Sequence, residues 1–141
     1  MEIINDGAYA FTDGSYNTKT GRFGYGGFLV SEGQEYVLQG SSADPELAES
    51  WNVAGEIYGS VAAIEKAKEL GIGELTIYYD YMGVEMWATG QWKAKKPVSR
   101  RYKAYIDKSN VTLHFVHVKG HSGIPGNERA DKLAKEAVGV G

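Results

Sequence analysis

Four acidic residues stand in sequence settings that favour chemistry. Asp13 and Asp80 each end an apolar run that reads as a β-strand, and Glu56 and Asp131 lie on segments with helical periodicity. Hard divalent cations such as Mg²⁺ take oxygen ligands, so converging carboxylates form the kind of site that metal-assisted phosphoryl transfer requires. The four residues therefore indicate a metal site, provided that the fold brings their side chains together.

Each acid also has an ordinary explanation. An aspartate at a strand end is often a turn former or a helix cap, and Asp131 fits an exposed acid that complements a helix dipole. Glu56 is harder to explain in this way, because it lies beside Ile57 at the margin of an apolar helical stripe. An unpaired carboxylate there is costly. Taken together, the four acids favour a metal site more strongly than any one of them alone.

Apolar periodicity and turn residues predict the elements that must position these acids. Strands are expected at residues 8–13, 24–31, 34–40, 74–79 and 111–118, and helices at 53–70, 81–88, 98–108 and 127–138. Gly14-Ser15 is a turn signal after the first strand, and Gly71 is expected to end the first long helix with a positive φ.

This order of elements predicts one α/β domain over residues 1–141. The expected sheet is mixed and five-stranded, with three antiparallel strands followed by two parallel additions in the order 3-2-1-4-5, and helices flank it. Asp13 and Asp80 would then lie at the carboxyl ends of neighbouring parallel strands, where open α/β sheets bind their ligands.

Composition narrows the class of protein. With 141 residues, 43% of them hydrophobic and 23% charged, the chain fits a single globular domain. It has no cysteine, which excludes disulfides and thiolate metal sites and leads us to expect a cytoplasmic location. No secretory signal and no segment of membrane-spanning length is visible in the sequence.

The charge distribution is uneven. The net charge of −3 argues against a general polyanion binder, but residues 93–103 carry basic side chains and no acid. These residues are Lys93, Lys95, Lys96, Arg100, Arg101 and Lys103, with Trp87 and Trp92 nearby. Local charge of this kind attracts phosphates, although it is also compatible with a solvated helix face.

Several motifs now fall in a recognisable order. Phe11-Thr12-Asp13-Gly14-Ser15 comes first, then Glu56 early in the long helix, Asp80 after the fourth strand, and two blocks near the end. The blocks are Lys119-Gly120-His121-Ser122-Gly123 and Asn127-Glu128-Arg129-Ala130-Asp131-Lys132-Leu133-Ala134. Together they resemble the catalytic domain of type 1 ribonuclease H, of the ribonuclease H-like superfamily, over essentially the whole chain.

The resemblance implies an endonuclease that hydrolyses the RNA strand of RNA–DNA hybrids and leaves 5′-phosphate and 3′-hydroxyl ends. Asp13, Glu56, Asp80 and Asp131 would bind two Mg²⁺ ions about 4 Å apart, and Mn²⁺ is an expected substitute. One ion would orient and deprotonate the attacking water, and the other would stabilise the leaving 3′ oxygen. His121 matches the family's mobile-loop histidine, which is thought to assist proton transfer or product release.

The resemblance also implies contacts to the hybrid, from backbone, amide and basic side chains. The expected residues are Gly14, Ser15, Asn52, Asn127, Lys93, Lys95, Lys96, Arg100 and Arg101. The chain departs from the family pattern at Val53, where many members have a second asparagine, and at Tyr81-Met82, where Ser-Gln is common. We expect a monomer, and the sequence style resembles domains that follow a hybrid-binding module in longer proteins.

Two alternatives from other classes remain open at this point. The chain could be a module that holds hybrids without cutting them, or another nuclease on the same scaffold, such as a resolvase, an integrase-like domain or an exonuclease. The intact acidic quartet argues against a pure binder, and the block around Asn127 and Asp131 favours hybrid cleavage. His114 and His117, on opposite faces of the last strand, match nothing catalytic and are interpreted as structural.

Overall fold

The computed structural model describes residues 7–43, 51–119 and 123–140, without the side chains of Trp51 and Asn52. Its strands are β1 (Ala8–Asn17), β2 (Arg22–Ser31), β3 (Gln34–Ser42), β4 (Glu74–Tyr79) and β5 (Thr112–His117). Its helices are α1 (Trp51–Glu69), α2 (Gly83–Thr89), α3 (Pro97–Lys108) and α4 (Pro125–Ala137). None of the helices described is both long enough and apolar enough to cross a bilayer.

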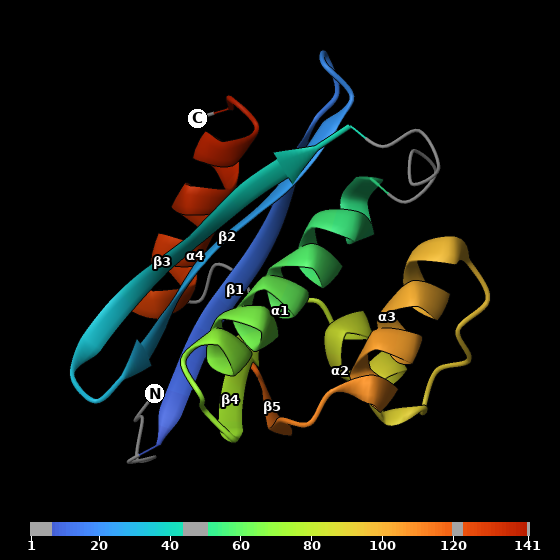
Figure 1. The fold of residues 1–141 in the computed structure, drawn as a ribbon. Helices are drawn as coiled ribbons and strands as arrows, with labels where there is room; N and C mark the ends of the chain where they lie inside the picture. Colours follow the sequence, from blue (N-terminus) through green and yellow to red (C-terminus); the bar gives the residue numbers. More distant parts are fainter. Residues whose placement is uncertain (1–6, 44–50, 120–122, 141) are drawn as a thin grey trace.

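The strands form one sheet in the order β3-β2-β1-β4-β5, which confirms the predicted topology. β1 pairs antiparallel with β2, and β2 pairs antiparallel with β3. β4 lies parallel to both β1 and β5. Parallel neighbours need a crossover connection, and α1 supplies the one between the meander and β4 (Figure 1).

Helices cover both faces of the sheet. α1, α2 and α3 pack on one face around a core that includes Ile57, Ile77 and Tyr102, all almost completely buried. α4 covers the other face, where Ala130 packs against a smaller aromatic cluster built on Phe11 and Tyr78 (Figure 1). The two rings stack with centroids 4.7 Å apart. Because side chains alternate across a strand, Asp13 and Asp80 share the α4 face with these two rings.

The predicted end of the first strand at Asp13 was wrong, whereas the bounds of the other elements agree with the prediction to within about two residues. Gly14-Ser15 does not turn the chain: β1 continues to Asn17, and Gly14 and Ser15 pair with Tyr25 and Gly24 of β2. Gly71, in contrast, ends α1 as expected, with φ of 74° and its N–H donating to the carbonyl of Lys68.

Gly14 has a packing role instead. A Cβ atom at this position would lie 2.3 Å from the backbone nitrogen of Glu56 and 2.6 Å from the carbonyl carbon of Gly55. Gly55 in turn meets the carbonyl oxygen of Gly24, which would lie 2.2 Å from an added Cβ. Two facing glycines therefore let α1 lie directly on β1 and β2, and this contact fixes the depth of Glu56 beside Asp13.

This contact makes Gly14→Ala a sharp test of the packing. We expect the added methyl group to push α1 from the sheet and to lower the free energy of unfolding by about 1–3 kcal/mol. Gly73→Ala is the matched control, because a Cβ there meets nothing within 4 Å. Urea denaturation of both variants measures the difference, and equal stabilities would contradict the proposed contact.

Candidate active site

The sheet register places the two strand-end aspartates at the same level. The last parallel pair between β1 and β4 is Phe11 with Tyr78, so Asp13 and Asp80 each lie two residues beyond it. At that point β4 has ended while β1 continues, and the two strands no longer pair. The space between them is therefore open to a side chain from α1.

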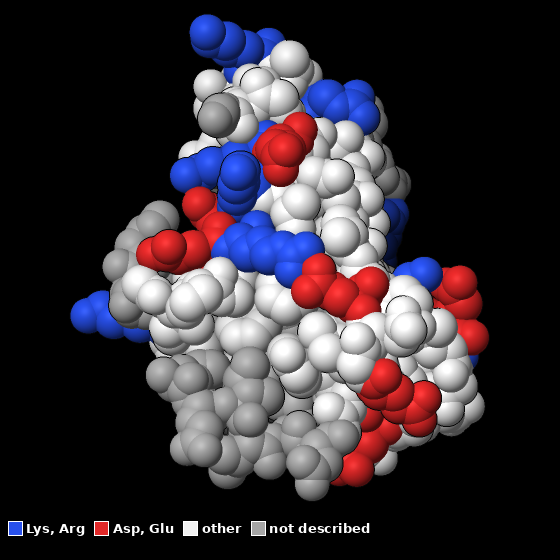
Figure 2. Space-filling view, turned by 90° about the vertical axis from the view of Figure 1, so that its left-hand side faces the viewer, with Lys and Arg blue, Asp and Glu red and all other residues white. Residues whose placement is uncertain are grey.

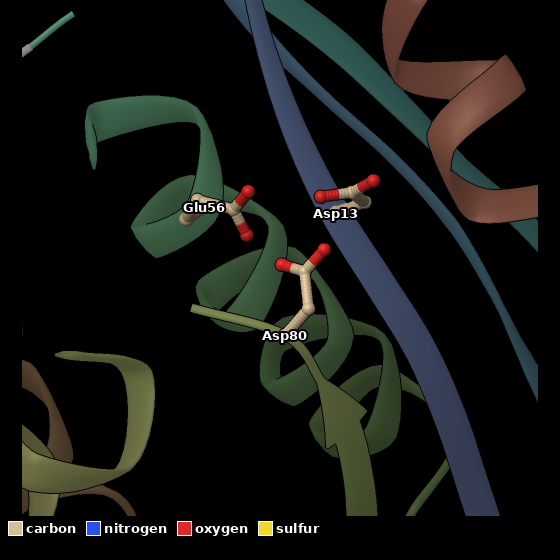
Figure 3. Close-up of side chains that lie close together, drawn as sticks. All are labelled: Asp13, Glu56 and Asp80. Atoms are coloured by element: carbon tan, nitrogen blue, oxygen red, sulfur yellow. The ribbon is translucent and has the colours of Figure 1, made fainter. Parts of the chain in front are cut away.

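Glu56 reaches this space from the opposite face of the sheet. Its carboxylate, with those of Asp13 and Asp80, points into one common region (Figure 3). Each of the three residues offers a carboxylate oxygen, and these atoms all lie within 4.8 Å of one another. The spacing would allow the three side chains to share one cation, whereas the sequence predicted four carboxylates, with Asp131, around two cations.

Burial and mutual repulsion act on all three carboxyl groups. Asp13 is only 4% exposed, and burial raises its pKa to about 7, helped by the charges of Asp80 and Asp131 and opposed by a hydrogen bond with Glu56. Burial and then the charge of Asp13 raise the pKa of Glu56 well above its usual range. The pKa of Asp80 is raised mainly by burial and also by the charge of Asp131.

Backbone contacts only partly offset this cost. The N–H of Gly14 donates to Oδ1 of Asp13 at 2.9 Å. A backbone hydrogen bond from Gly14 also lowers the pKa of Glu56, but less than burial and the neighbouring aspartates raise it. Ionised together, the three groups would repel one another, and their carboxylate oxygens could hold a metal ion at this spacing.

Asp131 lies near this cluster but outside its closest group. It is half-buried on α4, and its Oδ2 pairs with Nζ of Lys135 one turn along the helix at 3.1 Å. Its charge nevertheless raises the pKa of Asp13 and Asp80, which places it within electrostatic reach of both. Its service as a fourth metal ligand stays a prediction.

The other predicted site residues differ in whether the structure describes them and in how deeply they are buried. His121 lies outside the described residues, as does the side chain of Asn52. Asn127 is only 3% exposed in the first turn of α4, a placement that favours an internal role over direct contact with a ligand. Gly14 and Ser15 are half-buried in β1 beside the carboxylates.

The predicted basic contacts lie near α2 and α3, which pack on the same face of the sheet as α1 (Figure 1). All of the predicted phosphate contacts are exposed, on the segment between α2 and α3 and on the first turns of α3: Lys93, Lys95, Lys96, Arg100 and Arg101. The face covered by α4 differs, since basic and acidic side chains lie side by side there (Figure 2). Ion pairs such as Arg129 with Glu35 account for this mixture. The segment between α2 and α3 carries basic residues and no acidic ones, which favours it as the place where phosphates bind.

The raised pKa values lead to a prediction for the metal-free protein. Between pH 5 and pH 8 the folded chain binds more protons than the unfolded chain, because the pKa of Asp13 is about 7 when folded and 3.8 otherwise. Stability is therefore greatest below the unfolded pKa and is lost as pH rises through the folded one. We expect the free energy of unfolding in chelator to fall by about 2–4 kcal/mol over this interval, at roughly 1.4 kcal/mol per pKa unit.

Urea denaturation at pH 5 and pH 8 measures this decrease. Asp13→Asn serves as the comparison, because a neutral side chain at the same place should flatten the pH dependence and stabilise the chelated protein at pH 8. A wild-type protein that gains stability in chelator from pH 5 to pH 8 would contradict the account of the cluster.

Comparison with known proteins agrees with this geometry. A family model described as RNase H matches residues 5–139. Ribonuclease H of Pseudomonas syringae is 32% identical over 146 residues, which cover 96% of this chain and 94% of that protein. Human Ribonuclease H1 is 31% identical over 152 residues and 98% of this chain, and the chain spans about half (52%) of its length.

Two solved structures share the fold. RNase H1 from the archaeon Halobacterium salinarum superposes with a TM-score of 0.71 at 27% identity, covering 92% of this chain and 96% of that one. LC11-RNase H1, solved in complex with an RNA/DNA hybrid, superposes with a TM-score of 0.74 at 22% identity, covering 94% and 96%.

Proposed function

Since this chain belongs to the ribonuclease H family and is a nuclease of that family, we propose that it hydrolyses the RNA strand of RNA–DNA hybrids with the help of divalent cations. The observation that carries the proposal is the convergence of Asp13, Glu56 and Asp80 within 4.8 Å from three different elements. The hybrid complex of LC11-RNase H1 supports the choice of substrate, because that enzyme shares the fold.

The residues present fit a magnesium centre. Asp13, Glu56 and Asp80 would hold the cation, with Asp131 as the fourth acid for a second one. Bound in this way, a pair of Mg²⁺ ions would activate the attacking water and stabilise the leaving 3′ oxygen, which gives 5′-phosphate and 3′-hydroxyl ends. Mn²⁺ has similar ligand preferences and should substitute.

The chain's own groups have separate tasks in this proposal. Asp13, buried on a continuous strand, gives the most rigid ligand, and the N–H of Gly14 orients its carboxylate. Glu56 enters from the other face of the sheet and would complete the carboxylate set around the cation. Discrimination of RNA from DNA has to act through the 2′-hydroxyl, and the backbone at Gly14 and Ser15 is our candidate for it. His121 is proposed to assist proton transfer or product release.

The segment between α2 and α3 is proposed to hold phosphates of the paired DNA strand. We further propose that the protein acts as a monomer in the cytoplasm. The exposed basic side chains support the phosphate contacts, and the lack of cysteine in the sequence supports the cytoplasmic location. A longer natural protein with a hybrid-binding module is compatible with the match to human Ribonuclease H1, of which the chain spans about half.

Replacement of Asp80 by asparagine tests the reaction itself. The amide keeps the size of the side chain but removes the charge that holds the cation, so cleavage of a labelled hybrid should fall by a factor on the order of 10³ or more while hybrid binding persists. Asp107→Asn is the matched control, because Asp107 is an exposed acid on α3 that pairs with Lys103.

The unmodified protein should cut the RNA strand of a hybrid with Mg²⁺ or Mn²⁺ and leave RNA–RNA and DNA–DNA duplexes intact. Gel analysis of the three duplexes, with and without chelator, measures this selectivity. Tight hybrid binding without any cleavage would support the binding module instead, and cleavage of DNA duplexes would support another nuclease on this scaffold.

Salt dependence tests the basic segment. Removing the lysine that neutralises one phosphate should reduce the slope of log K against log salt by about 0.7–0.9, so Lys95→Ala with Lys96→Ala should lower it by about 1.4–1.8. Lys68→Ala on α1, where Lys68 pairs with Glu65, is the control. Titration of a labelled hybrid at several salt concentrations gives the slopes, and identical slopes would refute a role for this segment.

A further inference from the structure

The end of β4 is tied to the end of β5 just before Asp80. The last register pair between the two strands is Tyr79 with His117, and the N–H of Val118 donates to the carbonyl oxygen of Tyr79 at 2.7 Å. Beyond that bond the ladder has ended, and Asp80 leaves the sheet at the point where its carboxylate must meet Asp13 and Glu56.

The side chain of His117 continues the connection past the ladder. Its Nε2 lies 2.9 Å from the main-chain carbonyl oxygen of Asp80. A carbonyl oxygen can only accept a hydrogen bond, so Nε2 must carry the proton and donate. His117 is exposed, yet its ring is also held edge-on against the buried ring of Tyr79, with centroids 5.5 Å apart.

We propose that His117 is a positioning residue, whose Nε2–H holds the main chain of Asp80 and so keeps the Asp80 carboxylate in the metal-binding cluster. This inference rests on the proposed function and revises the structural role expected for His117 from the sequence. Groups that orient metal ligands commonly contribute 10–100-fold to metal affinity, although they touch no metal.

The need for such a group follows from the charges. Asp80 is only partly buried and is repelled by its acidic neighbours, so an Asp80 free to turn about its backbone would move its carboxylate toward solvent. Asp13 is held differently, because it lies within the continuous strand β1 with β2 beside it. The hydrogen bond from His117 supplies for Asp80 a part of the restraint that the sheet supplies for Asp13.

His114 provides an internal comparison on the same strand. It is also exposed, and its Nε2 lies 2.5 Å from a carboxylate oxygen of Glu74. Glu74 begins β4, whereas Asp80 follows its end. His114 therefore contacts a side-chain carboxylate at the start of β4, whereas His117 contacts the main chain of a residue of the acidic cluster.

Three variants separate the hydrogen bond from the ring contact. His117→Phe keeps a ring against Tyr79 but has no donor, whereas His117→Gln keeps a donor at a similar reach but has no ring. His114→Phe removes the other contact between a β5 histidine and β4. Calorimetric titration with Mg²⁺ gives the affinity of each variant, and thermal unfolding with Mg²⁺ and with chelator shows how strongly the metal stabilises each one.

We expect His117→Phe to bind Mg²⁺ about tenfold more weakly and to need correspondingly more Mg²⁺ for hybrid cleavage. His117→Gln should stay within about threefold of wild type, and His114→Phe should match it. Wild-type affinity in His117→Phe, or an equal decrease in His117→Gln and His117→Phe, would overturn the inference while the proposed function stands. A wild-type protein that neither binds Mg²⁺ nor cuts the hybrid would overturn both.

Discussion

Repulsion among buried carboxylates is the constraint on which the rest of this structure depends. Asp13, Glu56 and Asp80 hold one carboxylate oxygen each within 4.8 Å of one another, and burial and mutual repulsion raise the pKa of all three groups. Folding must therefore hold the three groups against their own repulsion until a cation binds. A rigid sheet supplies that force more readily than a loop, because its backbone hydrogen bonds leave few alternatives.

Two features of the scaffold hold the cluster. The parallel register of β1 and β4 sets Asp13 and Asp80 at one level on one face. The facing glycines at positions 14 and 55 bring α1 down onto the other face, so that Glu56 reaches through the opening beyond the last strand pair. The site is thus made where the two layers of the molecule meet, and neither layer alone could form it.

Much of this arrangement was predictable from local patterns. The order of strands and helices predicted the sheet topology, and with it the placement of Asp13 and Asp80 at the ends of neighbouring parallel strands. The role of Gly14 was not predictable in this way, because a Gly-Ser pair is a turn signal and only the approach of a distant helix makes it a packing position.

Contacts between residues far apart in the sequence could not be predicted from local patterns either. Asp131 pairs locally with Lys135 on the same helix. The distance of Asp131 from the other three acids, however, depends on how α4 lies across the sheet. The contact of His117 with Asp80 depends on the register of β4 with β5, which no periodicity specifies. The burial of Asn127 likewise follows from tertiary packing and not from its place in a motif.

Anomalous diffraction from crystals grown with Mn²⁺ would locate a bound metal among the acidic side chains. We expect a manganese peak between Asp13, Glu56 and Asp80, with carboxylate oxygens of all three residues at coordinating distance. A well-ordered structure with Mn²⁺ bound elsewhere, or with the three carboxylates turned apart and no metal between them, would contradict this expectation.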